Sequence, residues 1–540
     1  MNETLSSPFG FPSWEGDWNP RALLSIHLAP YLLGIIMIAI TKYTWATTDS
    51  NLKKLPSVNP AGFFSMARAQ QEFVHSANEL LQKARDLYPN RPYRMTTDSG
   101  DAVVLQSEAM EEIRNSPGLS FFGTFAQERI CEVPGFEPLA ALGVNGELIQ
   151  IVTRKWLTRS LDQVTSPLSE ETSFALKTIL GESTEWREAT ITPMSYDLTS
   201  RISSRVFLGQ ELSRNEDWLR IAKGYTASIL TGNNKLREYP VHLRPYIGRL
   251  PLIPECGRAR EYYTRAKKLI GSVMKEREEM RQAAKLAGQP APIFNDALEW
   301  INQESKARNL KYDPATFQMI LSFVAIGTTT DALHTTLTDL IQHPEALQAV
   351  REEIIHVLRA QGWKKSSLYH MKLLDSVIKE SQRIKPVFSA MRRSVDVETR
   401  LSDGTVLKKG SRIYIDTHRM LDPAVYENPA EWKADRYLEL RSHPGKEHMA
   451  QLVATSTDHM GFGHGEHACP GRFFAATQLK IALCHMLINY DWKLAPGTDI
   501  KFVEIGFRQR ANPATKVLYR KREALNFDID SVEGGITATL

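Results

Sequence analysis

The sequence predicts a single large domain that is mainly α, with a minor β part. Apolar residues recur at helical spacing in many long stretches, whereas only one region has the pattern of a β-hairpin. From about residue 60 onward there is no internal repeat, low-complexity segment or long linker, so one domain is favoured over several. With 540 residues, 42% of them hydrophobic, the chain can bury a large core.

The expected helices and the hairpin follow directly from these patterns. The hairpin is expected near 397–415, because Asp403-Gly404 lies there between two β-forming segments. Helical periodicity predicts helices over 67–87, 145–162, 216–231, 256–285, 314–342, 344–360, 371–384 and 471–489.

The charge balance and the cysteines argue against two classes of protein, nucleic-acid-binding proteins and disulfide-rich secreted proteins. The 66 basic and 62 acidic residues nearly balance, at a formal net charge of +4, which gives no support to nucleic-acid binding. The cysteines are scattered and contain no CxxC pair, so they do not resemble a disulfide framework and suit a reducing compartment. They are Cys131, Cys256, Cys469 and Cys484.

Residues 22–40 contain no charged side chain and are long enough to span a bilayer core of about 30 Å at about 1.5 Å per residue. The alternatives are a signal peptide or a buried helix. A signal peptide starts with a basic region, yet the first twenty residues contain no Lys or Arg. Lys42, Lys53 and Lys54 follow the span, so the positive-inside rule leaves the rest of the chain in the cytosol.

These features predict five segments. They are a lumenal N-terminus (1–21, with a glycosylation sequon at Asn2), an anchor (22–40), a linker with a proline-rich hinge (41–60), a catalytic domain (61–525) and a C-terminal tail (526–540).

The stretch GFGHGEHACPGRFF, residues 461–474, combines glycines, histidines and a cysteine just before an apolar helix. Two interpretations compete. One is a metal site such as zinc, built from His459, His464, His467 and Cys469. In the other, Cys469 alone binds a group and the glycines let the backbone come close to it.

Glu380 and Arg383 lie three residues apart in a predicted helix and therefore share a face. Exposed pairs at this spacing are common and contribute only a few tenths of a kcal/mol. Arg436, in the later stretch NPAEWKADRY, could reach back to this pair and form a bidentate network.

The predicted helix 321–336, LSFVAIGTTTDALHTT, is interrupted by Gly327 and three threonines, which are poor helix formers. It is either bent or open beside a ligand, or a core helix whose hydroxyls bond back to the preceding turn.

Taken together, these motifs resemble those of the cytochrome P450 family of haem-thiolate monooxygenases. The stretch 462–471 fits Phe-x-x-Gly-x-x-x-Cys-x-Gly, and the Glu380-x-x-Arg383, WKADRY and Thr-rich motifs occur in the family's order. The resemblance covers about residues 60–525 and implies a cytochrome P450 fold. The anchor and hinge look like those of microsomal members. The stretches VAIGTTT, RKWLTRSL and SAMRR look like fungal members near the ent-kaurene and indole-diterpene oxidases.

The resemblance assigns roles around the cofactor, haem b. Cys469 would be the axial thiolate ligand of the iron, Phe462 would pack on the macrocycle, and Gly465 and Gly471 would let the backbone approach. The helix that begins near Gly471 should lower the thiol pKa.

His467, Arg392 and Arg154 would bind the haem propionates, with Arg154 in competition with the neighbouring Lys155 and Arg159.

Thr328 matches the threonine that takes part in proton delivery during oxygen activation. The family usually places Asp or Glu before it, where this chain has Gly327. Asp331 could compensate, or it could cap the helix or face solvent.

The resemblance implies a single-pass enzyme of the endoplasmic reticulum membrane with its catalytic domain in the cytosol. It would take NADPH-derived electrons from NADPH–cytochrome P450 reductase, with cytochrome b5 as a further candidate donor. The lipophilic substrate would be a terpenoid or meroterpenoid of fungal secondary metabolism. The alternatives are a reductase-independent haem-thiolate isomerase or peroxygenase, and a non-catalytic haem-binding protein.

Overall fold

The computed structural model describes residues 52–62, 65–144, 146–523 and 527–533, together with Tyr31, Gly34, Ile35, Met37 and Ile38. The chain divides into two units, Met1–Lys53 and Lys54–Leu540. Within the residues so described, no helix is long and apolar enough to cross a bilayer. The expected anchor at 22–40 lies mostly outside them, as does Asn2.

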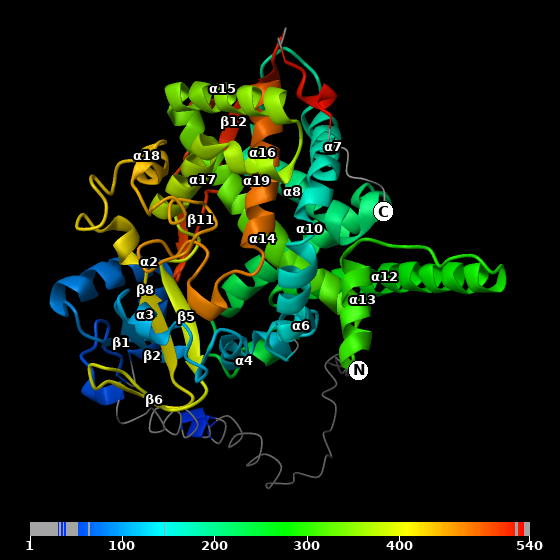
Figure 1. Ribbon diagram of the computed structural model, residues 1–540. Helices are drawn as coiled ribbons and strands as arrows, with labels where there is room; N and C mark the ends of the chain where they lie inside the picture. Colours follow the sequence, from blue (N-terminus) through cyan, green and yellow to red (C-terminus); the bar gives the residue numbers. More distant parts are fainter. Residues whose placement is uncertain are drawn as a thin grey trace, which may run out of the picture. The chain divides into compact units, whose positions relative to one another are not determined.

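The second unit is mainly helical, as the sequence predicts (Figure 1). Its longer helices are α2 (Met66–Leu87), α7 (Leu161–Leu180), α8 (Ile191–Phe207), α10 (Glu216–Leu236), α12 (Pro254–Leu286), α13 (Ala297–Arg308), α14 (Pro314–Gln342), α15 (Pro344–Gln361), α17 (Lys372–Ile384) and α19 (Arg472–Asn489). Shorter ones are α3 (Ala109–Ile113), α4 (Gly123–Glu128), α5 (Glu137–Val144), α6 (Gly146–Ile151), α9 (Gly209–Ser213), α11 (Arg244–Ile247), α16 (Lys365–His370) and α18 (Arg436–Ser442).

Among the residues that the structure describes, the β part consists of four small sheets. The largest has the order β1-β2-β8-β5-β3 and contains one parallel pair, β2 with β8. The others are β4-β12-β9, the hairpin β10-β11 and the hairpin β6-β7. The strands are β1 (Tyr93–Thr97), β2 (Gly100–Leu105), β3 (Leu119–Ser120), β4 (Arg187–Thr190), β5 (Ala390–Val395), β6 (Thr399–Arg400), β7 (Val406–Leu407), β8 (Arg412–Asp416), β9 (Tyr490–Leu494), β10 (Val503–Ile505), β11 (Arg508–Arg510) and β12 (Lys516–Lys521).

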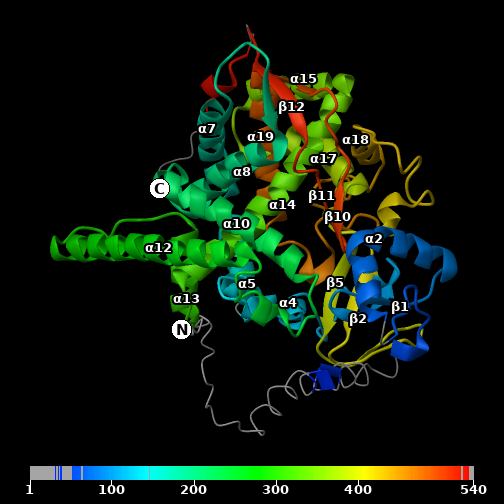
Figure 2. The ribbon, with the colours of Figure 1, turned by 180° about the vertical axis from the view of Figure 1, so that it is seen from behind.

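Helix α14 lies in the middle of the helical part and contacts α8, α10, α12, α17 and α19 (Figures 1 and 2). Asp313 caps it, because its carboxylate accepts a hydrogen bond from the Thr316 N–H, and Pro314 occupies the first turn. The helix is continuous, and several threonine hydroxyls donate to carbonyls of the preceding turn. The back-bonded hydroxyls agree with the core-helix alternative. Thr328 is nevertheless exposed, which agrees with the alternative of a helix open beside a ligand.

Two segments differ from the expectation. The helix expected at 145–162 is α6 followed by a π-helix, η3 (Val152–Leu157), and α7 starts only at Leu161. The hairpin expected at 397–415 is the short pair β6–β7, whereas β8 joins the larger sheet and pairs with β2 and β5.

The described part of the expected C-terminal tail, residues 527–533, packs onto the domain. Ile529 is fully buried, and its carbonyl accepts a hydrogen bond from the indole of Trp363 at 3.5 Å. The Trp363 ring stacks on His485 of α19, and the backbone N–H of Trp363 donates to the Glu533 carbonyl.

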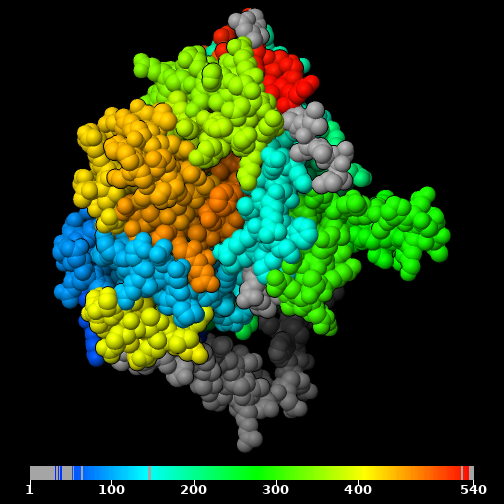
Figure 3. Space-filling model, viewed as in Figure 1, coloured from blue at the N-terminus to red at the C-terminus, as the bar shows by residue number. Residues whose placement is uncertain are grey.

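The C-terminal half of α12 projects from the unit (Figure 3).

Candidate active site

The loop before α19 is closed by its own backbone. The Cys469 N–H donates to the Phe462 carbonyl at 2.8 Å, and Gly463 and Gly465 adopt positive φ angles of 70° and 74°. A Cβ at Gly465 would lie 2.5 Å from the carbonyl oxygen of Arg114. The glycines therefore permit a conformation and a close backbone approach that a larger residue would prevent.

This loop presents Cys469 at the beginning of α19, where the side chain is half-buried. Burial raises the pKa of the Cys469 thiol, while N–H groups of Gly471 and Arg472 and the charge of Arg472 act in the opposite direction. The N–H groups at the start of α19 therefore lower the pKa, as expected, but in the protein without haem desolvation outweighs them. A bound metal ion would deprotonate a coordinating thiol.

The zinc interpretation has no support in this geometry. The Nε2 atoms of His459 and His467 lie 3.2 Å and 2.9 Å from the carbonyls of Lys379 and Leu119. His464 contacts Thr455 and Glu111 instead. Within the part of the chain that the structure covers, no three His, Cys, Asp or Glu side chains are placed to share a metal ion.

Two buried nitrogens without a hydrogen-bond partner lie near the loop. Arg393 is 3% exposed, and its Nη2 has no hydrogen-bond partner. His467 has a buried Nδ1 without a partner. Burial lowers the pKa of Arg393 to about 10. Burial also lowers the pKa of His467, and the positive charge of Arg393 lowers it further. The exposed Arg154 donates to the Glu466 carbonyl at 2.9 Å, and its charge also acts on His467.

Arg392 has another partner. Its guanidinium forms an ion pair with Glu128 of α4 and lies 4.6 Å from the ring centroid of Phe125. Because neighbouring residues of a strand point to opposite faces, only one of the two arginines of β5 can face the loop. The resemblance implies a propionate role for Arg392, whereas the buried donor without an acceptor is on Arg393. The alternation of the strand shows that only one of the two can turn inward, and the pairing of β5 decides which one.

On α14, Thr328 is exposed although the residues on both sides of it are buried. Its hydroxyl donates to the Val324 carbonyl at 2.9 Å. Gly327 has room for a side chain, since an added Cβ would meet Leu230 Cδ1 at 3.4 Å and the Tyr196 hydroxyl only at 3.9 Å. Asp331 neither caps the helix nor faces solvent, because it is buried and paired with Arg508 at 3.3 Å.

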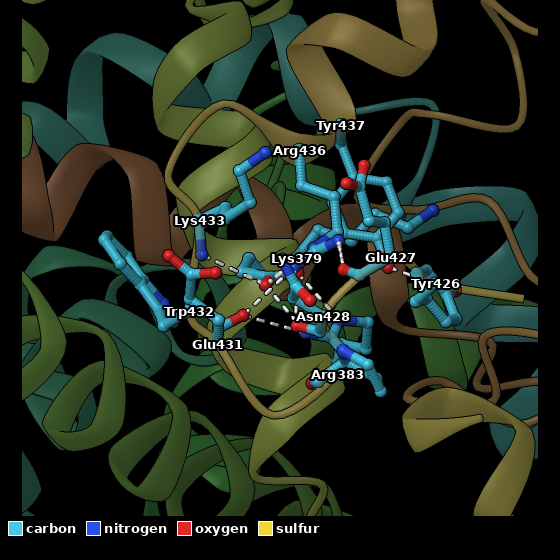
Figure 4. A network of polar contacts seen from close by, with 12 residues as sticks. Lys379, Arg383, Tyr426, Glu427, Asn428, Glu431, Trp432, Lys433, Arg436 and Tyr437 are labelled. Atoms are coloured by element: carbon cyan, nitrogen blue, oxygen red, sulfur yellow. Dashed lines mark hydrogen bonds and ion pairs between the residues drawn. The ribbon is translucent and has the colours of Figure 1, made fainter. Parts of the chain in front are cut away.

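The structure brings Glu380, Arg383 and Arg436 together in one network. Figure 4 shows Arg383 and Arg436 with the residues around them. Two nitrogens of Arg383 donate to the two carboxylate oxygens of Glu380 at 2.8 Å, and Arg436 Nε donates at 2.9 Å. Both side chains of the first pair are fully buried. The remaining donors of the two arginines bind backbone carbonyls, including those of Met420, Pro429, Glu427 and Glu431. The network thereby fixes α17 to the segment 420–436.

The residues present suit a haem. A thiol stands at the start of α19 on a loop that exposes its backbone, and α19 contacts α14, which carries the exposed Thr328. Arg393 offers a buried N–H donor that lacks an acceptor, as a propionate carboxylate would require. The unpartnered Nδ1 of His467 can donate only when the ring is protonated, because its Nε2 already donates to the Leu119 carbonyl. Phe462 is partly buried within the same loop.

Comparison with known proteins agrees with this site. The family profile described as Cytochrome P450 matches residues 150–518. The cytochrome P450 monooxygenase hepE of Aspergillus oryzae is 43% identical over 94% of this chain and 91% of its own length. The cytochrome P450 monooxygenase eqxH of Fusarium heterosporum is 38% identical over 92% of this chain and 97% of its own.

A solved structure, the retinoic-acid-bound cyanobacterial CYP120A1, superposes with a TM-score of 0.65 at 17% identity. It covers 87% of this chain and 99% of its own, so it supports the fold. The fold, the loop around Cys469 and the fungal relatives lead to one conclusion: the chain belongs to the cytochrome P450 family and is a haem-thiolate monooxygenase.

Proposed function

We propose that this monooxygenase takes two electrons from NADPH through NADPH–cytochrome P450 reductase and oxidises a lipophilic terpenoid or meroterpenoid by hydroxylation, epoxidation or desaturation. In a hydroxylation, one atom of O2 enters the substrate and the other leaves as water. The observation that carries the proposal is the placement of Cys469 at the start of α19, on a helix that contacts the one bearing Thr328. The fungal origin of the relatives supports a substrate from secondary metabolism.

When bound, haem b would supply oxygen activation, which a thiolate ligand favours by donating electron density. Cys469 would hold the iron, and Arg393 and His467 would bind the propionates through their buried nitrogens. Arg154 is a further candidate at the exposed edge, next to the Glu466 carbonyl. Arg392 would act indirectly, because its pair with Glu128 ties β5 to α4.

Thr328 would hold or pass a proton at its hydroxyl on the distal side, where it is exposed. Gly327 provides no carboxylate beside it, and this feature favours two alternatives that need no reductase, a peroxygenase and an isomerase. A peroxygenase would use peroxide in place of NADPH and O2. An isomerase would need neither, so the requirement for co-substrates separates all three.

We also propose attachment to the endoplasmic reticulum through residues 22–40, with the catalytic domain in the cytosol. Tyr246, Leu250 and Leu252, around α11, are exposed apolar side chains that suit contact with a lipid surface. Ile253, in the same stretch, is buried and would not take part. Resistance of the membrane-bound protein to carbonate extraction checks this, and release of the full chain into the supernatant would contradict it.

The first test of the function is the spectrum of the reduced, carbon-monoxide-bound protein in microsomes. We expect a strongly red-shifted Soret band, which Cys469→Ser should abolish while the control Cys131→Ser retains it. With reductase, terpenoid turnover should then depend on both NADPH and O2. An unshifted band in the unmodified protein would overturn the thiolate assignment, and turnover with peroxide alone would favour the peroxygenase.

A further inference from the structure

The short strand β11 carries two arginines toward α14. Arg508 and Arg510 lie two residues apart on β11 and therefore on one face, while Gln509 between them bonds to the Val387 carbonyl through its backbone. Figure 2 shows β10 and β11 beside α2, on one side of α14. The Arg508 guanidinium contacts the buried Asp331 of α14 at 3.3 Å.

This cluster carries one cation more than it has anions. Asp331 pairs with Arg508, and the neighbouring Lys385 pairs with Asp339. Arg510 is half-buried, and its guanidinium has no hydrogen bond or ion pair within 4 Å to a residue that the structure describes, although its charge acts on Asp331 from a greater distance. The Nε atoms of both Arg508 and Arg510 are buried without a partner.

The other polar neighbours cannot supply the missing negative charge. Tyr196 of α8 stays neutral, because burial and the charge of Asp331 raise the pKa of its hydroxyl. His334 of α14 contacts the Thr192 hydroxyl, and burial lowers the pKa of its ring to about 3. An uncompensated, half-buried guanidinium is costly, so an acceptor from outside the chain is expected.

The cluster borders the site that contains Thr328. Asp331 lies one turn beyond Thr328, about 4.5 Å along the helix axis and on a neighbouring face. Phe388 forms an isolated antiparallel bridge with Arg508, so the two side chains lie on the same face of the pair. Phe388 is 40% exposed although buried residues follow it, and it offers an apolar surface beside the guanidinium.

We propose that Arg508 and Arg510 bind an anionic group of the substrate, a carboxylate or a group of similar shape and charge, and so orient its apolar body across Phe388 toward Thr328. The proposal rests on the proposed function, since it specifies the substrate class of the same site. Asp331 would hold Arg508 in place as a positioning residue. A bidentate guanidinium–carboxylate contact would then give geometric selectivity as well as affinity.

The test compares a terpenoid acid with its neutral derivatives. Abietic acid, methyl abietate and abietinol share one ring system and differ in charge. We expect the haem-bound protein to bind the acid about tenfold to a hundredfold more tightly than the ester, as measured by calorimetry, because charge-assisted hydrogen bonds have that range of strength.

Arg510→Gln should remove this preference by lowering affinity for the acid and leaving affinity for the ester unchanged. Arg510→Lys keeps the charge and should retain part of the preference. Arg520→Gln is the matched control, since Arg520 pairs with Asp491 on the separate sheet β4-β12-β9 and should behave as the unmodified protein.

Equal binding of acid and ester by the unmodified protein would overturn the proposal, and this arm needs no variant to fold. Equal acid preference in the unmodified protein and in folded Arg510→Gln would overturn the assignment to Arg510. The carbon-monoxide spectrum of each preparation shows whether a failure concerns only the binding of the anionic group or the monooxygenase function itself. A red-shifted band without acid preference refutes only this inference, whereas an unshifted band refutes the proposed function.

Discussion

The loop that holds Cys469 and the surroundings of Thr328 are built in different ways. Ten consecutive residues, 462–471, make the loop, and its backbone closes on itself between Phe462 and Cys469. The surroundings of Thr328 come from α8, α10, α14, β11 and the segment before β5. The geometry of a contiguous motif can be predicted from its own sequence. A site assembled from distant segments can be identified only in the folded structure.

The largest expected effect is a loss of stability, and it tests whether the loop folds independently of the rest of the chain. A Cβ at Gly461 would meet the side chain of Gln382, so the loop packs against α17 beside the Glu380 network. Glu380→Gln leaves Arg383 and Arg436 without their carboxylate and should destabilise the fold by about 3–5 kcal/mol. That is a large share of a typical stability of about 5–15 kcal/mol.

We therefore expect little or no haem-bound protein from Glu380→Gln, measured as the yield of carbon-monoxide-binding protein and by thermal unfolding. The control, Glu261→Gln, removes an exposed pair with Arg265 on α12 and should change stability by less than about 0.5 kcal/mol. A normal yield from Glu380→Gln would mean that the loop folds independently of this network.

The second prediction separates two adjacent arginines. Arg393→Gln should speed dissociation of haem about tenfold to a hundredfold, because it removes a buried charged donor from the carboxylates. Arg392→Gln should instead lower the melting temperature by breaking the pair with Glu128, without changing the rate of haem loss. Transfer of haem to apomyoglobin measures both rates, and faster loss from Arg392→Gln alone would return the propionate role to Arg392.

The smallest expected effect concerns the distal side. Gly327→Asp places a carboxylate next to Thr328, where an added Cβ meets no atom closer than 3.4 Å. We expect the yield of product per NADPH to rise about twofold to fivefold, well below the 10²–10⁴-fold typical of an essential general acid. Gly327→Ala controls for bulk and should leave the yield unchanged or lower it. Equal yields from the two variants would show that the carboxylate does not matter here.

The elements that the sequence predicts well have signals at their ends. Helix α14 begins and ends as predicted, because Asp313-Pro314 starts it and Pro344 follows its last residues. Helix α8 was not predicted, since its sequence ITPMSYDLTSRISSRVF is rich in Ser and Thr. Those residues disfavour an isolated helix, and packing against α7 and α14 overrides that preference.

The same contrast applies within the site. Cys469, Glu380, Arg383 and Arg436 were identifiable because each lies in a motif. Arg393 was not, since only the pairing of β5 decides which of two adjacent arginines turns inward. Arg508 and Arg510 were not identified either, because no local pattern reveals that β11 lies against α14.

The packing of residues 527–533 also limits how far the domain can be shortened by truncation or proteolysis. This segment binds Trp363, whose ring stacks on His485 of α19. A chain that stops before Phe527 would leave Trp363 uncovered as an apolar target for quality control.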